Sequence, residues 1–183
     1  MKASPEELGR EALALCRGEG FALAGICDAR PSARGEELRA WLAAGRHGSM
    51  ERLARNVEER IDPGVMVEGA RSLIVVADQY AAPDGGKEAA EERSATFGRI
   101  ARYARGRDYH TVMKKRLHRL CDALRGRLEE GAALRAFVDT APVLEREHAA
   151  RAGLGWIGKH TLLIHPERGS YLLLGGVITT AEL

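Results

Sequence analysis

The spacing of apolar and polar positions along the chain predicts helices that alternate with short strands. After Ser4 the apolar positions recur every three to four residues, and Glu7 completes a capping box, so a first helix is expected. The apolar run at 21–27 predicts a buried strand, and residues 36–44 predict a second helix. Residues 73–77 (Leu-Ile-Val-Val-Ala) are the clearest strand core, being apolar throughout and rich in β-branched side chains.

The second half of the chain continues this alternation. Asp108 is expected to cap a long amphipathic helix that ends at Gly131, and residues 135–138 predict a strand. Pro142 introduces a helix that continues to about residue 152.

The remaining segments predict turns and a terminal hairpin. The run 81–98 is loop-like, with proline, glycine and many charges, and 100–104 is expected to be extended. Two apolar runs, 161–165 and 171–179, flank a turn and predict an antiparallel hairpin. The expected fold is therefore α/β, with a mixed β-sheet and flanking helices.

Composition narrows the class of protein. The chain has 183 residues, of which 45% are hydrophobic and 30% charged, which excludes wholesale disorder. No apolar run approaches the ~20 residues of a spanning helix, so a cytoplasmic protein without membrane contact is expected. Cys16, Cys27 and Cys121 are too few and too widely spaced for a disulfide framework, a zinc ribbon or a four-cysteine iron–sulfur site. Reduced, packed thiols are expected instead.

Basic residues are concentrated between Arg99 and Arg119. This stretch holds eight of the 28 lysines and arginines, with Asp108 as its only acid. Such a stripe can follow a phosphate backbone, but charge alone favours the solvated face of a helix.

Generic motifs exclude several chemistries. Residues 153–158 fit G-x-G-x-x-G, but the motif follows a predicted helix and precedes a strand, so a dinucleotide site is rejected. Asp108-Tyr109-His110 opens like the box that supplies a cobalt-ligating histidine, although Met113 occupies its glycine position. No Walker loop, H-E-x-x-H or G-x-S-x-G is present, and no metal site is expected.

Two side chains stand out as candidates for chemistry. Asp139 follows an apolar strand, where partial desolvation would raise its pKa and suit it to proton donation; it could instead cap the following helix. Lys159, in a glycine-flanked loop, could meet a phosphate or carboxylate, or be a solvated surface lysine.

Longer motifs resemble those of a known family. Residues 98–110 (GRIARYARGRDYH) and 138–163, with VDTAPVLER and AGLGWIGKH, are similar to signatures of the epoxyqueuosine reductases. The stretches 169–175 and 59–63 continue the resemblance, which covers nearly the whole chain.

The resemblance implies a cobalamin-dependent oxidoreductase, related to reductive dehalogenases, that reduces epoxyqueuosine to queuosine in tRNA. The implied fold is a nitroreductase-like cobalamin-binding domain. Asp139 matches the proton donor of the family, and the positions matched to the corrinoid lining are Arg60, Ala101, Asp139, Leu144, Leu163 and Leu174. The basic stripe would then hold tRNA through Arg102 and Arg105, and Lys159 is a further expected tRNA contact.

The chain departs from the family in two ways. Residues 1–183 are expected to form a single cobalamin-binding domain, without the iron–sulfur domain that follows in the family. Iron–sulfur clusters would therefore have to come from a separate reductase chain, in a truncated or split enzyme. Gly176 also stands where the family commonly has glutamate. A non-catalytic corrinoid-binding module and a flavin-dependent nitroreductase-like enzyme are the alternative interpretations.

Overall fold

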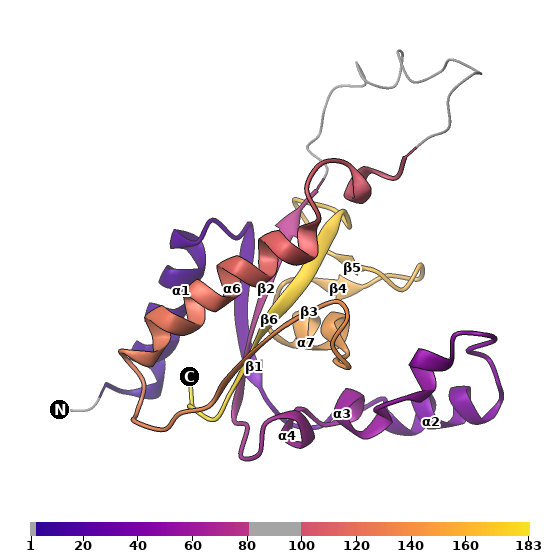
Figure 1. Ribbon diagram of the computed structural model, residues 1–183, viewed down its shortest axis with the longest axis horizontal. Helices are drawn as coiled ribbons and strands as arrows, with labels where there is room; N and C mark the ends of the chain where they lie inside the picture. Colours follow the sequence, from indigo (N-terminus) through magenta and orange to yellow (C-terminus); the bar gives the residue numbers. More distant parts are fainter. Residues whose placement is uncertain (1–2, 81–99) are drawn as a thin grey trace, which may run out of the picture.

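The computed structural model describes residues 3–80 and 100–183, so the loop expected at 81–98 lies outside the described residues. At its centre is a four-stranded sheet in the order β1-β2-β6-β3 (Figure 1). Its strands are β1 (Leu23–Asp28), β2 (Ser72–Gln79), β6 (Leu172–Thr179) and β3 (Leu134–Val138).

The expected α/β architecture is confirmed, but the sheet is antiparallel rather than mixed. Each pairing among the described strands is antiparallel, with Leu23 opposite Ala77 and Val138 opposite Gly175. The connection between β1 and β2 stays at one end of the sheet, so β2 starts where β1 finished (Figure 1). That connection contains α2 (Gly35–Ala43), η1 (Glu51–Ala54), α3 (Val57–Ile61) and α4 (Pro63–Met66).

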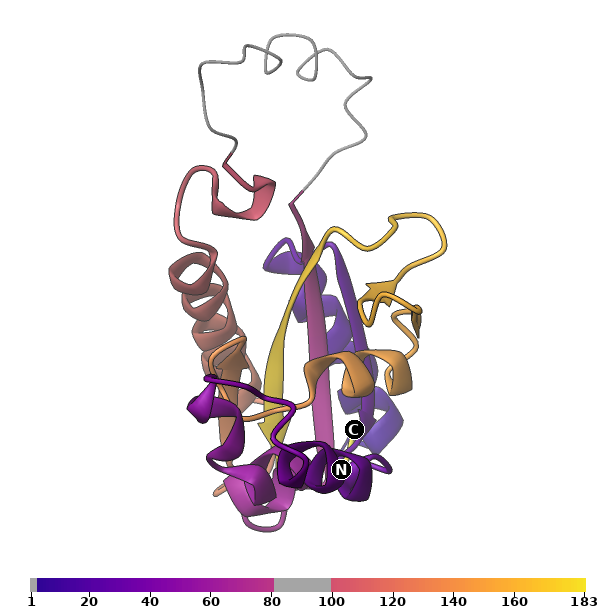
Figure 2. The same cartoon turned by 90° about the vertical axis from the view of Figure 1, so that its right-hand side faces the viewer.

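Helices cover both faces of the sheet (Figure 2). The helices α1 (Pro5–Gly18) and α6 (Tyr109–Arg125) pack on one face, and α7 (Glu145–Arg151) packs on the other. The predicted capping box is confirmed, because Ser4 Oγ accepts from the Glu7 amide while Glu7 Oε2 accepts from the Ser4 amide. Helix α6 stops at Arg125, earlier than the expected Gly131.

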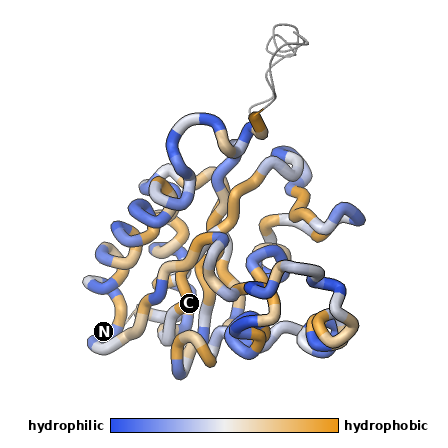
Figure 3. The backbone as a smooth tube through the Cα atoms, turned by 45° about the vertical axis from the view of Figure 1, so that its right-hand side comes forward, coloured by the Kyte–Doolittle hydropathy of each residue, from blue (hydrophilic) through white to orange (hydrophobic). Residues whose placement is uncertain are grey.

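The central strand β2 explains why the sheet has two cores. Its residues Leu73, Val75 and Ala77 join the core under α7, whereas Ile74 and Val76 join the core under α1 and α6. Because side chains alternate along a strand, a strand buried on both faces must be apolar throughout, as the 73–77 run predicted. The apolar stretches of Figure 3 follow this central layer.

The prediction that residues 161–165 and 171–179 form a hairpin is wrong. The first of these runs forms the short strand β5 (Leu163–Ile164), which pairs with β4 (Trp156–Ile157) in a separate two-stranded sheet. Strand β6 instead lies between β2 and β3, where its apolar side chains are buried. The prediction that residues 100–104 are extended is also wrong, since this segment contains the 3-10 helix η2 (Arg102–Ala104).

The cysteine prediction is confirmed. Cys16, Cys27 and Cys121 are free thiols buried among apolar neighbours, and burial raises the pKa of Cys27 to about 11. Within residues 3–80 and 100–183, no helix is both long and apolar enough to cross a bilayer. The rejected glycine motif at 153–158 follows α7 and contains β4 (Trp156–Ile157), so it lacks the strand-to-helix turn of a dinucleotide site.

Candidate functional site

Asp139 is held by two side chains from the start of α6. It follows β3 directly and has a positive φ of 37°. Its Oδ2 accepts a hydrogen bond from the Tyr109 hydroxyl at 2.9 Å and lies 3.1 Å from His110 Nε2. Segments about thirty residues apart in the sequence therefore meet at one carboxylate.

Two expectations about Asp139 are wrong. Its side chain is 58% exposed, so Asp139 is more hydrated than its place at the end of an apolar strand predicted. Nor does it cap the next helix, because α7 begins at Glu145 with Leu144 at the N-cap position. The loop between β3 and α7 is longer than expected, and it turns Asp139 toward α6 instead.

His110 is fixed between two carboxylates. Asp108 caps α6 by accepting from the His110 amide, and its Oδ1 also lies 2.8 Å from His110 Nδ1. The rings of Tyr109 and His110 stack at 4.0 Å. Hydrogen bonds to Asp108 and then to Asp139 raise the pKa of His110, which favours the imidazolium that donates to both carboxylates. Burial and the hydrogen bond to Asp139 raise the pKa of Tyr109, so its hydroxyl remains a donor.

A second carboxyl, Glu145, lies near Asp139 in a different environment. It is the first residue of α7, and its Oε1 is buried without a hydrogen-bond partner among the described residues. The pKa of Glu145 is raised to about 7, mainly by burial and in smaller part by the Asp139 charge, while Arg146 and Arg60 oppose the shift. Arg60, on α3, also has a buried and unpartnered Nε within the described part of the chain. The site thus holds an exposed, hydrogen-bonded carboxylate and a buried carboxyl that titrates near neutrality.

The positions matched to the corrinoid lining fall in two places. Leu163 is buried in the core under α7, and Leu174 packs against that core. Leu144 precedes Glu145 at the start of α7, and the Arg60 charge acts on Glu145, so these residues share the same face of the sheet. Ala101 lies apart from them, exposed just before η2.

The basic stripe divides between internal and exposed roles. Arg116 pairs with Asp78 and donates to the Glu19 carbonyl, and Arg119 pairs with Glu19 at 2.6 Å. These arginines tie α6 to its neighbours. Other basic residues of the stripe are exposed at η2 and just after it, including Arg102 and Arg105. Lys159 is also exposed, but it lies outside the stripe, in the turn between β4 and β5.

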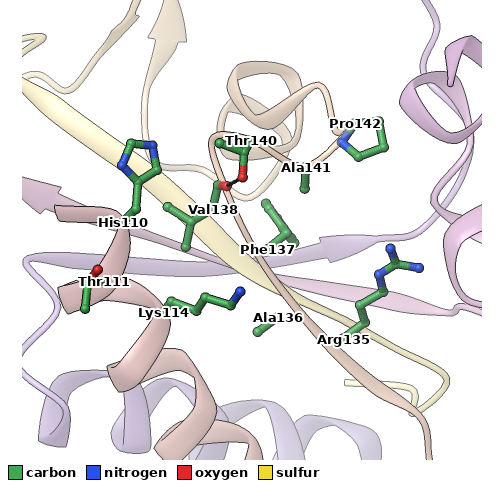
Figure 4. A pocket seen from close by; sticks show the side chains of 10 residues that line it. All are labelled: His110, Thr111, Lys114, Arg135, Ala136, Phe137, Val138, Thr140, Ala141 and Pro142. Atoms are coloured by element: carbon green, nitrogen blue, oxygen red, sulfur yellow. Dashed lines mark hydrogen bonds between the residues drawn. The ribbon is translucent and has the colours of Figure 1, made fainter. Parts of the chain in front are cut away.

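A cavity of about 570 Å³ lies between α6, β3 and the segment that follows Asp139 (Figure 4). His110 and Lys114 enter it from α6, and Thr140 and Pro142 bound it beyond Asp139. Its size is typical of small-molecule sites. The cavity places two basic side chains beside the loop that carries Asp139.

Comparisons with known proteins match the part of the chain that carries most of this site. A family model described as epoxyqueuosine reductase QueG, DUF1730, matches residues 60–140, which include Arg60, His110 and Asp139. An epoxyqueuosine reductase of Aliivibrio fischeri is 37% identical over 183 residues, covering 100% of this chain and 49% of its own length. Over its whole length, the chain is similar to the epoxyqueuosine reductases.

Solved structures of the family have the same fold. The epoxyqueuosine reductase of Streptococcus thermophilus superposes with a TM-score of 0.81 at 31% identity, covering 95% of this chain and 46% of that one. A further epoxyqueuosine reductase, solved with an epoxyqueuosine-modified stem loop of tyrosine tRNA, has a TM-score of 0.79, 24% identity, and coverage of 97% and 46%. The chain spans about half the length of the curated relatives it matches.

Sequence reasoning missed three residues of the candidate site. Tyr109 and Glu145 stood in the quoted motifs but received no role, and His110 was considered only as a ligand for cobalt. The available signal was their position, since each falls at the start of a predicted helix beside the strand end that carries Asp139.

Proposed function

We propose that this chain is the cobalamin-binding domain of an epoxyqueuosine reductase, which removes the epoxide oxygen of epoxyqueuosine in tRNA. The observation that carries the proposal is the Asp139 carboxylate, which accepts from Tyr109, faces His110 and lies near Glu145. Glu145 and Arg60 each have a buried polar atom without a partner among the described residues. The similarity of the sequence over its whole length, and of the fold over 95% of the chain, to epoxyqueuosine reductases supports this assignment.

The residues present suit a corrinoid. Arg60 Nε and Glu145 Oε1 are a donor and an acceptor that are shielded from water without protein partners in the described residues. Buried polar atoms of this kind normally find a partner. The amide groups at the rim of a corrin ring offer both a carbonyl acceptor and an N–H donor. Leu144, Leu163 and Leu174 would supply apolar or backbone contacts on the same face.

The chain's own residues would manage protons. Removing the epoxide oxygen as water requires two electrons and two protons, and bound cobalamin supplies the reducing chemistry. Asp139, carrying a proton, would donate it to the departing oxygen. His110 Nε2, 3.1 Å from Asp139 Oδ2, would return a proton to that carboxylate, and Tyr109 would hold it in place.

Substrate and electron donor are further parts of the proposal. Arg102, Arg105 and Lys159 would contact tRNA phosphates, which is consistent with a cytoplasmic protein. The tRNA stem loop bound by the related enzyme described above supports this choice of substrate. Three buried cysteines cannot hold an iron–sulfur cluster of the four-cysteine type, so electrons would come from iron–sulfur clusters outside residues 1–183.

Cobalamin binding and turnover test the proposal separately. Adding hydroxocobalamin to the purified chain should change the visible spectrum with a saturable dependence on protein. Arg60→Met should weaken this binding, whereas Asp139→Asn should leave it within about twofold because Asp139 is exposed. With a strong chemical reductant and epoxyqueuosine-containing tRNA, queuosine detected by mass spectrometry should require Asp139.

The alternative interpretations predict other results. Tight cobalamin binding without turnover in the reduced sample would indicate a non-catalytic corrinoid-binding module. A flavin spectrum with no affinity for cobalamin would indicate a nitroreductase-like flavoenzyme and refute the proposal.

A further inference from the structure

All four tyrosines of the chain form one continuous cluster. The ring of Tyr80 contacts Tyr171 and Tyr103 edge-to-face, with centroids 5.5 and 6.3 Å apart, and Tyr103 contacts Tyr109 in the same way at 6.3 Å. These residues come from the end of β2, from η2, from the start of α6 and from the segment before β6. Such a gathering of every tyrosine at one end of the sheet calls for a functional reason.

The cluster is open to solvent at one side and joined to the candidate site at the other. Tyr103 is 49% exposed and Tyr171 is 50% exposed, whereas Tyr109 is partly buried and donates its hydroxyl hydrogen bond to Asp139. The guanidinium of Arg102 lies 5.8 Å from the centroid of Tyr171. Aromatic faces and a cation are therefore presented together, and ring contacts connect them to Tyr109, which donates to the candidate proton donor.

We propose that Tyr103, Tyr171 and Arg102 form a stacking surface for unpaired bases of the RNA substrate. Proteins that recognise single-stranded RNA stack its bases on aromatic rings and on arginine planes. This inference rests on the proposed function, and it adds a base-binding surface to the phosphate contacts considered above.

Charge favours RNA over a protein partner at this surface. Residues 100–107 contain three arginines and no acidic residue, and the carboxylate of the neighbouring Asp108 accepts a hydrogen bond from the His110 amide. A surface of this kind attracts a polyanion. Its position also suits the chemistry, because a base stacked on Tyr103 would hold adjacent nucleotides near Asp139.

Alanine and phenylalanine substitutions distinguish the rings from the hydroxyls. The probe is a synthetic anticodon stem loop with 2-aminopurine in the loop, whose fluorescence falls when the base stacks. Binding to the full chain should quench this fluorescence, and Tyr103→Ala or Tyr171→Ala should each weaken affinity about tenfold and relieve the quenching. Tyr103→Phe and Tyr171→Phe should bind within about twofold of the parent.

The salt dependence provides a matched control. The tyrosine variants remove no charge, so the slope of log affinity against log salt should match that of the parent, whereas Arg102→Gln should reduce it by about one. Alanine variants that bind and quench the loop like the parent would overturn the inference. Equal loss of affinity for a blunt RNA duplex would also overturn it, because paired bases offer no faces for stacking.

Hydroxocobalamin titration of the same variants separates this inference from the proposed function. The double variant Tyr103→Ala/Tyr171→Ala should keep the parent's cobalamin affinity and circular dichroism spectrum. If the parent binds no cobalamin but still stacks the loop base on these rings, the proposed function fails while the stacking surface stands. If cobalamin binds and the rings make no difference to RNA, the stacking surface fails.

Discussion

Replacing Glu145 with glutamine tests whether a protonated carboxyl lies beside Asp139. Burial raises the pKa of Glu145 from 4.5 to about 7, so the folded chain retains a proton that the unfolded chain releases between these values. The contribution of this raised pKa to the unfolding free energy is fully present below pH 4.5. It is lost as the pH rises through 7. The interval corresponds to about 3 kcal/mol of unfolding free energy.

Urea unfolding followed by circular dichroism measures this contribution. The free energy of unfolding of the parent, relative to Glu145→Gln, should fall by about 3 kcal/mol between pH 4.5 and pH 8. Taking the difference in unfolding free energy between parent and variant at each pH cancels the titration of all other groups. The exposed Glu130→Gln is the control, and its difference from the parent should not show this fall. In an Asp139→Asn background the transition should move to lower pH, because the Asp139 charge raises the pKa of Glu145. A parent-to-variant difference that stays constant with pH would refute the reasoning.

Two further substitutions probe the core. Gly176→Ala should lower the free energy of unfolding by about 1–3 kcal/mol, because the new Cβ would lie 2.2 Å from the Ile74 carbonyl oxygen. Gly18→Ala, which has open space around the added methyl, is the control, and equal melting temperatures for the two would contradict the packing argument. His148 is fully buried, and burial lowers its pKa to about 4, so its stabilising contribution is present above pH 6.5 and is lost as the pH falls through 4. The stability of the parent relative to His148→Gln should therefore decrease over that range in urea titrations, and a rising difference would show that the imidazole is charged in the fold.

Local pattern predicted those parts of the fold that local interactions determine. The capping box at Ser4 needs only two residues three positions apart, and it is present as expected. The apolar run at 73–77 predicted a buried strand because burial on both faces leaves no room for polar side chains. Gly176 fits the same account, since a side chain at that position would meet both β2 and the Phe137 ring.

Predictions that depended on strand pairing failed. The runs at 161–165 and 171–179 are neighbours in sequence, and a hairpin is the shortest way to pair them. Strand β6 pairs instead with β2 and β3, because that position buries its apolar residues between two layers of helices. Sequence adjacency carries no information about this long-range gain in burial.

The candidate site shows the same limit. The strand end predicted the place of Asp139 but not its surroundings, because Tyr109 and His110 reach it from a helix about thirty residues earlier. Asp139 proves exposed, while the desolvated carboxyl belongs to Glu145. If Asp139 is the acid of the reaction, the water around it has to be displaced by what binds there, since an acid in open solvent exchanges its proton with water before it meets the substrate. The complete acid site would then be formed by this chain together with its bound cofactor and RNA.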